Sequence, residues 1–396
     1  MQNKDFVTLV GPVMERFYAD LAALVNIDSG TYLKAGVDQV VAYLERRFRE
    51  FGFVTQLVEQ EEYGNHLVAT HEGSAQDGPR LLFIGHTDTV FPQDEALRRP
   101  FSYSEQAGLR IAKGPGVLDM KSGLLMGLYA LHLLIEAGTT DYRSVTFVCN
   151  SDEEVGSPSS KPLIERLARE ADAVLVFEPG RALNRFVSAR KGVANYRVEA
   201  HGLSSHAGVE PDKGRNAIVA LAYQVLELQA LNATIPGVTL NVGIICGGAR
   251  TNIVPDYAYC DIDVRVSDQA GLHAIEEALR RVTMHTHVDG TVITLTGGVR
   301  SMPFELTPAN QRLVELVKAA GRTLGLTLED VASGGGSDAN TTSALGCPTV
   351  DGLGAGGGLA HNPDEYVELD YLPLRLALIC EVVRYICNYY QDGWQL

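Results

Sequence analysis

The chain has 396 residues, 45% of them hydrophobic, and a formal net charge of −16. This length suits two domains better than one, and the composition indicates a soluble globular protein with a sizeable core. The negative charge repels nucleic-acid phosphates and anionic lipid, and no run of Lys and Arg provides a basic patch. We therefore expect no nucleic-acid partner and no membrane-surface partner.

The six cysteines are scattered without a C-x-x-C pair, and most lie in apolar runs such as VTFVCN. We expect reduced core thiols rather than disulfides or soft-metal ligands. The opening MQNKDFVTLV contains no long apolar segment of the kind found in signal peptides, and no apolar run approaches the roughly 20 residues of a membrane span. The cytoplasm is the expected compartment.

The first half of the chain alternates predicted helices and strands. A turn and an amphipathic helix lie within residues 24–52. Two strand-like segments, a second helix and two short apolar runs that end in acids follow, at residues 66–73, 80–86, 122–138, 144–154 and 173–180. This alternation predicts an α/β domain on a mostly parallel sheet.

The pattern changes between about residues 190 and 299. Strand-like and helical segments follow one another here in the order βαββαβ, at residues 192–202, 214–231, 238–248, 257–266, 269–285 and 291–298. This order predicts a small antiparallel α+β sandwich inserted into the larger domain. From Arg300 the α/β pattern returns, so we expect a larger domain of residues 1–189 and 300–396.

Polar residues stand at the ends of the strand-like segments. His86 and Asp88 follow a buried apolar run and, being two apart in an extended chain, point the same way. Further acids and a histidine follow apolar or Gly-rich runs, namely Asp119, Glu153, Glu154, Glu178 and His361. Open α/β sheets bind ligands beyond the carboxyl ends of their strands. We therefore expect these side chains to share one edge of the sheet.

Two imidazoles and three carboxylates, one of them bridging, are the ligand set that two zinc-like divalent ions require. Asp119, Glu154 and Glu178 would balance three of the four positive charges. Each residue alone has a structural alternative, because a histidine after a strand is often only hydrogen-bonded and SDEE suits a helix N-terminus. Taken together, five such positions favour metal binding over capping.

The motifs GHTDTV, GPGVLDMKSG, DEEVGS, FEPG and AHNPDEY resemble the metal-site motifs of the dizinc aminoacylase and carboxypeptidase family, most closely its glutamate carboxypeptidase branch. They occur in the family's order over nearly the whole chain. The resemblance implies two Zn²⁺, with Co²⁺ or Mn²⁺ as alternatives. It implies that His86 and Glu178 bind one ion, that Glu154 and His361 bind the other, and that Asp119 bridges them.

The resemblance also assigns catalytic roles. Glu153 would be the general base that takes a proton from water and later passes it to the leaving amine. Asp88 would contact the ring of His86 on the side away from the metal and so fix its orientation. The family usually has a cis peptide after the bridging aspartate, and Met120 stands there in place of a frequent acid. This departure leaves the five ligands unchanged.

The inserted domain carries motifs of its own. GLSSHAGVEPDKGRNA resembles the family's lid motif and implies that His206 helps to polarise the scissile carbonyl. Positions that match substrate-binding residues of the family are Asn252, Arg265, Arg300, Gly335 and Gly336, the glycines lying in SGGGSDAN. A guanidinium suits capture of a free carboxylate, although an arginine on a strand is more often a solvated surface residue.

The implied fold is a zinc-exopeptidase-like α/β catalytic domain with a mostly parallel central sheet, plus a βαββαβ lid and dimerisation domain at residues 190–299. The implied function is a dinuclear zinc exopeptidase that releases a C-terminal amino acid, expected to be glutamate, from a peptide or N-acyl compound. The alternative is an N-acyl-amino-acid deacylase of the acetylornithine or succinyl-diaminopimelate type. A non-catalytic metal protein would lack Glu153 or a ligand, and none is missing. The resemblance further implies a homodimer.

One motif points to a different class of protein. GLGAGG at residues 352–357 satisfies G-x-G-x-x-G, the glycine pattern of dinucleotide sites. A dinucleotide site of this kind requires a helix N-terminus directly after the glycines. LAHNPDEY, which includes Pro363, follows instead, so we expect no dinucleotide site.

Overall fold

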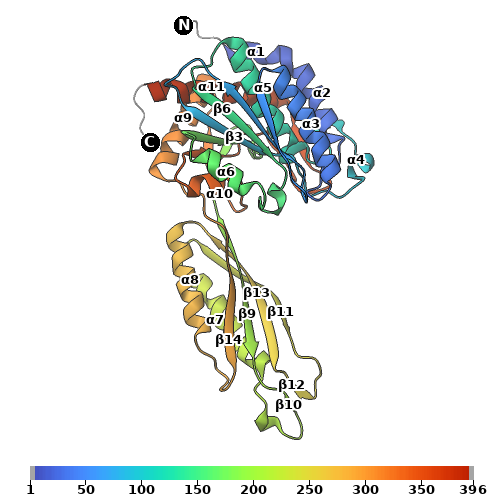
Figure 1. Ribbon diagram of the computed structural model, residues 1–396, viewed down its shortest axis with the longest axis vertical. Coiled ribbons are helices and arrows are strands. Elements are labelled where there is room, and N and C mark those ends of the chain that lie inside the picture. The colour runs from blue at the N-terminus through green and yellow to red at the C-terminus, as the bar shows by residue number, and fades with distance from the viewer. Residues whose placement is uncertain (1–4, 392–396) are drawn as a thin grey trace. The chain divides into compact units, whose positions relative to one another are not determined.

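The computed structural model describes residues 5–391. Within this range the chain divides into two compact units (Figure 1). Unit 1 consists of residues 5–189, 306–332 and 337–391, and unit 2 consists of residues 190–305 and 333–336.

In the described chain, unit 1 is built on a six-stranded sheet with the order β1-β2-β6-β3-β7-β16. Its strands are β1 (Val54–Val58), β2 (His66–Glu72), β3 (Arg80–His86), β6 (Ser144–Asn150), β7 (Ala173–Val176) and β16 (Thr349–Val350). The pairs β6–β3, β3–β7 and β7–β16 are parallel, and β1–β2 and β2–β6 are antiparallel. The predicted α/β domain with a mostly parallel sheet is confirmed, with β2 as the reversed strand.

Both faces of the central strand β3 are buried. Leu81 and Phe83 join the main apolar core, while Leu82 and Ile84, which point to the opposite face, are also 1% exposed or less. Parallel strands that are covered on both sides have continuously apolar sequences. This explains why polar and apolar residues do not alternate in this segment.

Helices cover the sheet of unit 1 (Figure 1). The α-helices described in unit 1 are α1 (Phe6–Val10), α2 (Met14–Val25), α3 (Lys34–Glu50), α4 (Glu95–Arg98), α5 (Ser122–Ala137), α6 (Lys161–Ala168), α9 (Pro308–Thr323), α10 (Asp338–Ala344) and α11 (Leu372–Gln391). Helix α5 packs on β3 and on α11. It ends at Gly138, whose φ of +66° is the left-handed conformation that commonly closes a helix.

The segment Val117–Ala137 corrects one expectation. It has 21 residues and is apolar enough to cross a bilayer by length and composition, although no run of that length was expected from the sequence. In the structure, 83% of its 18-residue apolar window is buried inside the protein. A helix at the centre of a globular core has the same composition, because it is apolar on all sides.

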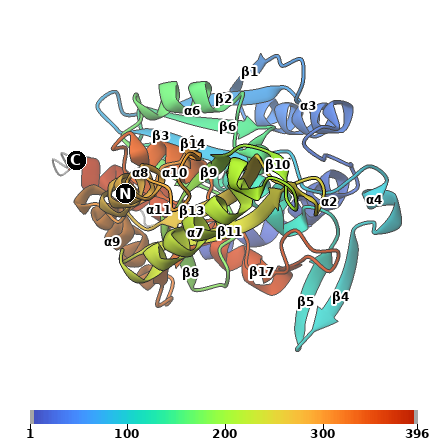
Figure 2. The ribbon, with the colours of Figure 1, turned by 90° about the horizontal axis from the view of Figure 1, so that it is seen from below.

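A second sheet of unit 1 has the order β17-β18-β5-β4 and is antiparallel. Its strands are β4 (Ser102–Gln106), β5 (Leu109–Lys113), β17 (Gly357–Gly358) and β18 (Tyr366–Glu368). The β4–β5 hairpin stands out clearly in Figure 2. A further two-stranded sheet is formed by β8 (Arg185–Arg190) and β15 (Glu329–Ser333). Neither of these small sheets was predicted from the sequence.

Unit 2 contains an antiparallel sheet with the order β11-β13-β9-β14. Its main elements are β9 (Gly192–His201), α7 (Ala217–Ala230), β11 (Val238–Gly247), β13 (Tyr257–Val266), α8 (Gln269–Thr283) and β14 (Val292–Ser301). Helices α7 and α8 pack on this sheet and against each other (Figure 1). The predicted βαββαβ order is confirmed. A short pair, β10 (Ser205–His206) and β12 (Ile253–Val254), is added to it.

The cysteines are free thiols, as expected, and all but one are buried. The exception is Cys246 on β11, which is exposed.

Candidate active site

Three neighbouring parallel strands bring polar residues to one edge of the main sheet. His86, the last residue of β3, pairs in register with Asn150, the last residue of β6. Ile84 pairs with Val176 at the end of β7, so Glu178, two residues further on, is level with His86. Because parallel strands end at the same edge, the residues that follow them meet there. Glu153 and Glu154 follow β6 in the short turn Glu153–Val155.

Asp119 and His361 reach the same place by other routes. Asp119 lies in the turn Val117–Lys121 that leads into α5, and His361 lies in the loop between β17 and β18. Neither residue follows a strand of the six-stranded sheet, so the expectation of a strand-end position is wrong for these two. Their positions depend on the small second sheet, which the sequence pattern did not reveal.

Asp119 stands between the two histidines. Its Oδ1 lies 3.1 Å from Nε2 of His86, and its Oδ2 lies 3.2 Å from Nε2 of His361. Glu178 Oε1 lies 3.7 Å from the same nitrogen of His86, and Glu154 Oε2 lies 3.2 Å from that of His361. Two ligand atoms on one tetrahedral zinc-like ion are about 3.3 Å apart. The spacing is therefore that of two adjacent ions sharing one carboxylate.

The surroundings of these side chains also fit a metal centre. Oε1 of Glu154 is buried without a hydrogen-bond partner, a costly state for a carboxylate oxygen unless a cation faces it. Candidate ligand atoms of His86, Glu153 and Glu178 lie within 4.8 Å of one another, as do those of His86, Asp119 and Glu154. Imidazole nitrogen and carboxylate oxygen are ligands that divalent ions of the zinc type accept.

The electrostatics of the protein alone show how strongly this site attracts positive charge. Burial lowers the pKa of His86, but hydrogen bonds to Asp119 and Asp88 outweigh it and hold the pKa well above its usual value. Hydrogen bonds to Asp119 and Glu154 raise the pKa of His361 to about 10. Burial, followed by the charge of Glu178, raises the pKa of Glu153 well above its usual value. Cations at this position would relieve the repulsion among the carboxylates.

Asp88 fixes both His86 and the turn that carries the two glutamates. The closest acceptor for Nδ1 of His86 is the backbone carbonyl of Asp88 at 3.0 Å, whereas the Asp88 carboxylate is 3.5 Å away. That carboxylate accepts hydrogen bonds from the backbone N–H groups of Glu153 and Glu154, each at 3.2 Å, and from the Thr31 hydroxyl at 2.7 Å. Asp88 is thus a positioning residue for more than the histidine ring.

Glu365 is a supporting residue that the sequence reasoning missed. Its fully buried carboxylate accepts hydrogen bonds from the backbone N–H groups of Gly116 at 3.2 Å, Leu118 at 2.7 Å and Asp119 at 2.9 Å. These bonds fix the turn that presents Asp119. Burial raises the pKa of Glu365 to about 7. Its only sequence signal was its place at the end of the His361 motif.

A buried polar network supports the loop of the two glutamates. Asp338, the first residue of α10, accepts hydrogen bonds from Asn150 Nδ2 at 2.8 Å and from the Ser157 hydroxyl at 2.6 Å. Asp152 accepts from the Ser160 hydroxyl at 2.5 Å. Burial raises the pKa of Asp338 to about 6. No pattern in the sequence linked these residues, which come from segments far apart in the chain.

The bond after Asp119 is a cis peptide, as the resemblance implied. Met120 is fully buried, and its sulfur accepts a hydrogen bond from the backbone N–H of His86 at 3.2 Å. A methionine thus contacts the metal-ligand candidate His86 at a position that is often acidic in the resembling family.

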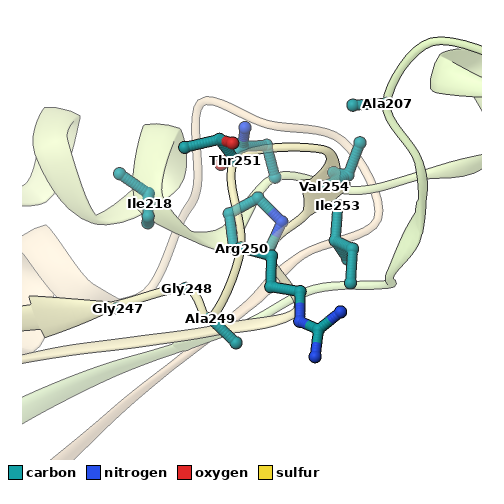
Figure 3. A pocket seen from close by; sticks show the side chains of 11 residues that line it. Ala207, Ile218, Gly247, Gly248, Ala249, Arg250, Thr251, Ile253 and Val254 are labelled. Atoms are coloured by element: carbon teal, nitrogen blue, oxygen red, sulfur yellow. The ribbon is translucent and has the colours of Figure 1, made fainter.

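His206 and Asn252 lie close together in unit 2. His206 is in β10, and the backbone carbonyl of Asn252 accepts a hydrogen bond from the N–H of Ala207 at 3.0 Å. Both side chains are exposed. A pocket of about 480 Å³, drawn in Figure 3, lies in the same unit. Its lining includes Ala207 and the residues on either side of Asn252, together with Arg250, which the sequence analysis did not single out.

The two candidate arginines lie on different strands of unit 2. Arg265 on β13 is half-buried, and its Nε donates a hydrogen bond to Asp263 Oδ2 at 2.9 Å. A substrate carboxylate would compete with this aspartate. Arg300 is exposed and stands at a bulge of β14, between Val299 and Ser301.

The candidate glycines are held by a residue that was not predicted. The carbonyl oxygens of Gly335 and Gly336 accept hydrogen bonds from Nη1 of Arg190, at 3.1 and 3.2 Å. Arg190 is 5% exposed. A buried guanidinium therefore determines the path of the glycine loop.

The G-x-G-x-x-G stretch at 352–357 does not have the geometry that a dinucleotide requires. Its last glycine enters the short strand β17 rather than the N-terminus of a helix. The backbone carbonyls of Gly352 and Gly354 instead accept hydrogen bonds from the buried guanidinium of Arg375, at 2.7 and 2.6 Å.

Known proteins that are similar to this chain include peptidases and a desuccinylase. Residues 82–385 match peptidase family M20/M25/M40. The chain is 31% identical over 375 residues to carboxypeptidase G2 of a Pseudomonas species, covering 92% of this chain and 87% of that protein. It is 28% identical over 349 residues to succinyl-diaminopimelate desuccinylase of Burkholderia vietnamiensis, covering 84% and 90%.

The fold also matches a solved structure over nearly its full length. Aminopeptidase PepT from Bacillus cereus superposes with a TM-score of 0.77 at 25% identity, covering 94% of this chain and 98% of that one. The resemblance inferred from the motifs is confirmed, and the protein is a metallohydrolase. The chain belongs to peptidase family M20/M25/M40.

Proposed function

We propose that the protein is a two-zinc exopeptidase that releases a C-terminal amino acid, with glutamate preferred, from a peptide or N-acyl compound. The observation that carries this proposal is the placement of Asp119 between two histidine–glutamate pairs, with Glu153 beside them. In this proposal His86 and Glu178 hold one ion, Glu154 and His361 hold the other, and Asp119 bridges them.

The proposed roles of the side chains follow from their chemistry. When bound, the ions supply Lewis acidity that polarises the amide carbonyl and lowers the pKa of water. Glu153 accepts a proton from the attacking water and returns it to the leaving nitrogen. Candidate ligand atoms of His86 and Glu178 lie within 4.8 Å of its carboxylate, so Glu153 stands beside the proposed ions. His206 donates a hydrogen bond to the developing oxyanion.

The proposed specificity rests on arginine chemistry. An exopeptidase must recognise the free carboxylate next to the bond that it cleaves, and a guanidinium can bind a carboxylate through two parallel hydrogen bonds. Arg265 or Arg300 would provide this contact. The relative at 31% identity is named a carboxypeptidase, which supports the same direction of cleavage.

A second candidate function keeps the same metal centre. The chain is also similar to a protein named succinyl-diaminopimelate desuccinylase, which supports an N-acyl-amino-acid deacylase. The two candidates differ in the group on the carbonyl side of the cleaved bond, an amino acid in one case and a simple acyl group in the other. Identities of 31% and 28% do not separate them.

A substrate panel tests the proposal directly. Zinc-loaded protein would be assayed against dipeptides with C-terminal Glu, Asp and Ala, and against N-acetyl and N-succinyl amino acids. We expect the highest kcat/KM on a dipeptide with C-terminal glutamate. Higher values throughout the acyl set would establish the deacylase instead. Parallel loading with Co²⁺ and Mn²⁺ tests the choice of zinc.

Blocking the substrate carboxylate tests the arginine contact separately. Amidation of the C-terminus removes the negative charge that the guanidinium binds, so cleavage of an otherwise good dipeptide should be abolished. Efficient cleavage of the amidated substrate would contradict an exopeptidase.

We also propose that the protein forms a homodimer through unit 2. Its edge strand β11 carries Ile244 and Ile245, which are 51% and 57% exposed. An edge strand with exposed apolar residues is a surface that proteins normally cover. Sedimentation velocity would give the mass of two chains, and Ile245→Asp should shift it toward one. The cytoplasmic location stays a prediction that cell fractionation would test.

A further inference from the structure

A second histidine–carboxylate cluster lies entirely within unit 2. It consists of Glu227, His285 and His287, and we call it the lid cluster. Glu227 is on α7, and the two histidines lie in the connection between α8 and β14. One candidate ligand atom from each of the three lies within 4.8 Å of the others. None of these residues belongs to the motifs of the proposed active site.

Both imidazoles of the lid cluster present the same nitrogen to one carboxylate. Nε2 of His287 lies 2.7 Å from Oε1 of Glu227, and Nε2 of His285 lies 3.5 Å from Oε2. That second oxygen is buried and makes no hydrogen bond in the structure. One carboxylate facing two ring nitrogens leaves an oxygen unsatisfied when no cation is present. Two imidazole nitrogens and a carboxylate this close together can bind one cation, because ligand atoms on one tetrahedral ion are about 3.3 Å apart.

The histidines are held in place by α7. The carbonyl of His285 accepts a hydrogen bond from Nε2 of Gln224, which is fully buried. The ring of His287 lies against the ring of Tyr223, with 4.8 Å between their centres. Tyr223, Gln224 and Glu227 are spaced to share one face of the helix. The backbone of His285 and the ring of His287 are therefore positioned before any ligand arrives, which lowers the cost of binding.

We propose that the lid cluster binds one divalent transition-metal ion, such as Zn²⁺ or Cu²⁺, through two imidazole nitrogens and one carboxylate. The side chains of Glu227, His285 and His287 are 34%, 57% and 38% exposed, so an ion and its remaining water ligands can reach them. Two nitrogen ligands and one carboxylate suit zinc, and copper binds such sets more tightly. Each imidazole would bind the ion through an unprotonated Nε2, so any proton on that nitrogen is released or moves to Nδ1.

The bound ion would tie α7 to the connection that leads from α8 into β14. An ion that binds only the folded state raises its stability in proportion to the logarithm of the ion concentration. The lid cluster would then stabilise unit 2 without taking part in hydrolysis.

The proposed site is tested by comparing the metal content of wild-type protein with that of a variant that lacks both histidines. Wild-type protein and the double variant His285→Ala/His287→Ala would be dialysed to equilibrium against the same low micromolar free Zn²⁺ and analysed for zinc per chain. We expect the double variant to bind one equivalent less, with kcat/KM unchanged. Because only the difference counts, the result does not depend on how many ions the active site holds.

Two further variants provide a second test of the site and a matched control. Glu227→Gln preserves the volume of the side chain but removes the charge, and it should also lose one equivalent. His273→Ala is the matched control, because His273 forms an exposed pair with Glu277 at 3.3 Å on α8 without a second histidine. This control should keep the wild-type zinc content. Circular dichroism would verify that each variant is folded.

Copper provides an independent spectroscopic measurement. One equivalent of Cu²⁺ added to zinc-loaded wild-type protein should give an electron paramagnetic resonance spectrum with nitrogen splitting from two imidazoles. The double variant should lose that signal, and His273→Ala should retain it. Equal zinc content in wild type and double variant, or an unchanged copper spectrum, would overturn the proposal.

Discussion

His86 and Asp88 in unit 1 are held more firmly by the surrounding structure than the exposed candidates His206, Asn252 and Arg300 in unit 2. His86 and Asp88 are at most 1% exposed, and several elements contribute hydrogen bonds around them. His206, Asn252 and Arg300 are exposed. The proposed roles of His86 and Asp88 therefore rest on fixed distances. The proposed roles of the exposed side chains of unit 2 depend on contacts with a bound substrate.

The largest expected effect separates two adjacent residues of unit 1. Glu153→Gln removes the proposed base but no proposed ligand, so both metal ions should stay while kcat falls by about 10²–10⁴-fold or more. Glu154→Gln removes a ligand, so metal should be lost. Metal analysis and kcat of the two purified variants check this. Equal metal loss in both would contradict the division of roles.

His206 tests whether an exposed residue of unit 2 is catalytic. His206→Ala should keep its metal and its fold but lose about 10²–10³-fold in kcat, the usual loss for one oxyanion donor. A purely structural role would change the melting temperature rather than kcat.

Mixed dimers sharpen the same prediction. A heterodimer of His206→Ala and Asp119→Ala chains has one intact metal centre and one intact histidine. If the histidine acts on the partner chain, this heterodimer should recover up to half of wild-type activity. An inactive heterodimer, shown by sedimentation to have formed, would mean that His206 serves its own chain or has no catalytic part.

The buried network of unit 1 should be visible in the pH dependence of stability. Burial raises the pKa of Asp338 to about 6, above its unfolded value of about 3.9. Its contribution to stability is therefore fully present below about pH 4 and is lost as the pH rises through 6. Between pH 4 and 7, the unfolding free energy of wild type should fall relative to Asp338→Asn by up to about 3 kcal/mol. Urea unfolding of metal-depleted proteins measures this, and a difference independent of pH would contradict it.

The smallest expected effect concerns Glu365, whose carboxylate supports the turn that carries Asp119. Glu365→Gln offers only one acceptor oxygen to three backbone N–H groups, so the turn that carries Asp119 should loosen. Loss of such a supporting contact weakens metal affinity by about 10–100-fold. Competition with a chromophoric chelator measures the affinity. Glu329→Gln is the control, because its pair with Arg185 is on the surface and should contribute little.

The sequence alone determined the alternation of elements and the residue types of the metal centre. Continuous apolar runs that end in His86 and before Glu178 predict parallel strands with polar ends, because a buried strand cannot continue through charged residues. The βαββαβ order between residues 190 and 299 was readable for a similar reason, since its helices and strands have clear periodicities.

Only the tertiary structure decided which distant residues support that centre. Asp119 and His361 are brought together by a small sheet whose strands are two to five residues long, too short to leave a periodic pattern. Glu365 and Asp338 are buried acids whose partners come from remote segments or from backbone N–H groups. The lid cluster depends on the packing of α7 beside the end of α8. Local sequence encodes periodicity and capping, whereas contacts between distant segments exist only once the chain has folded.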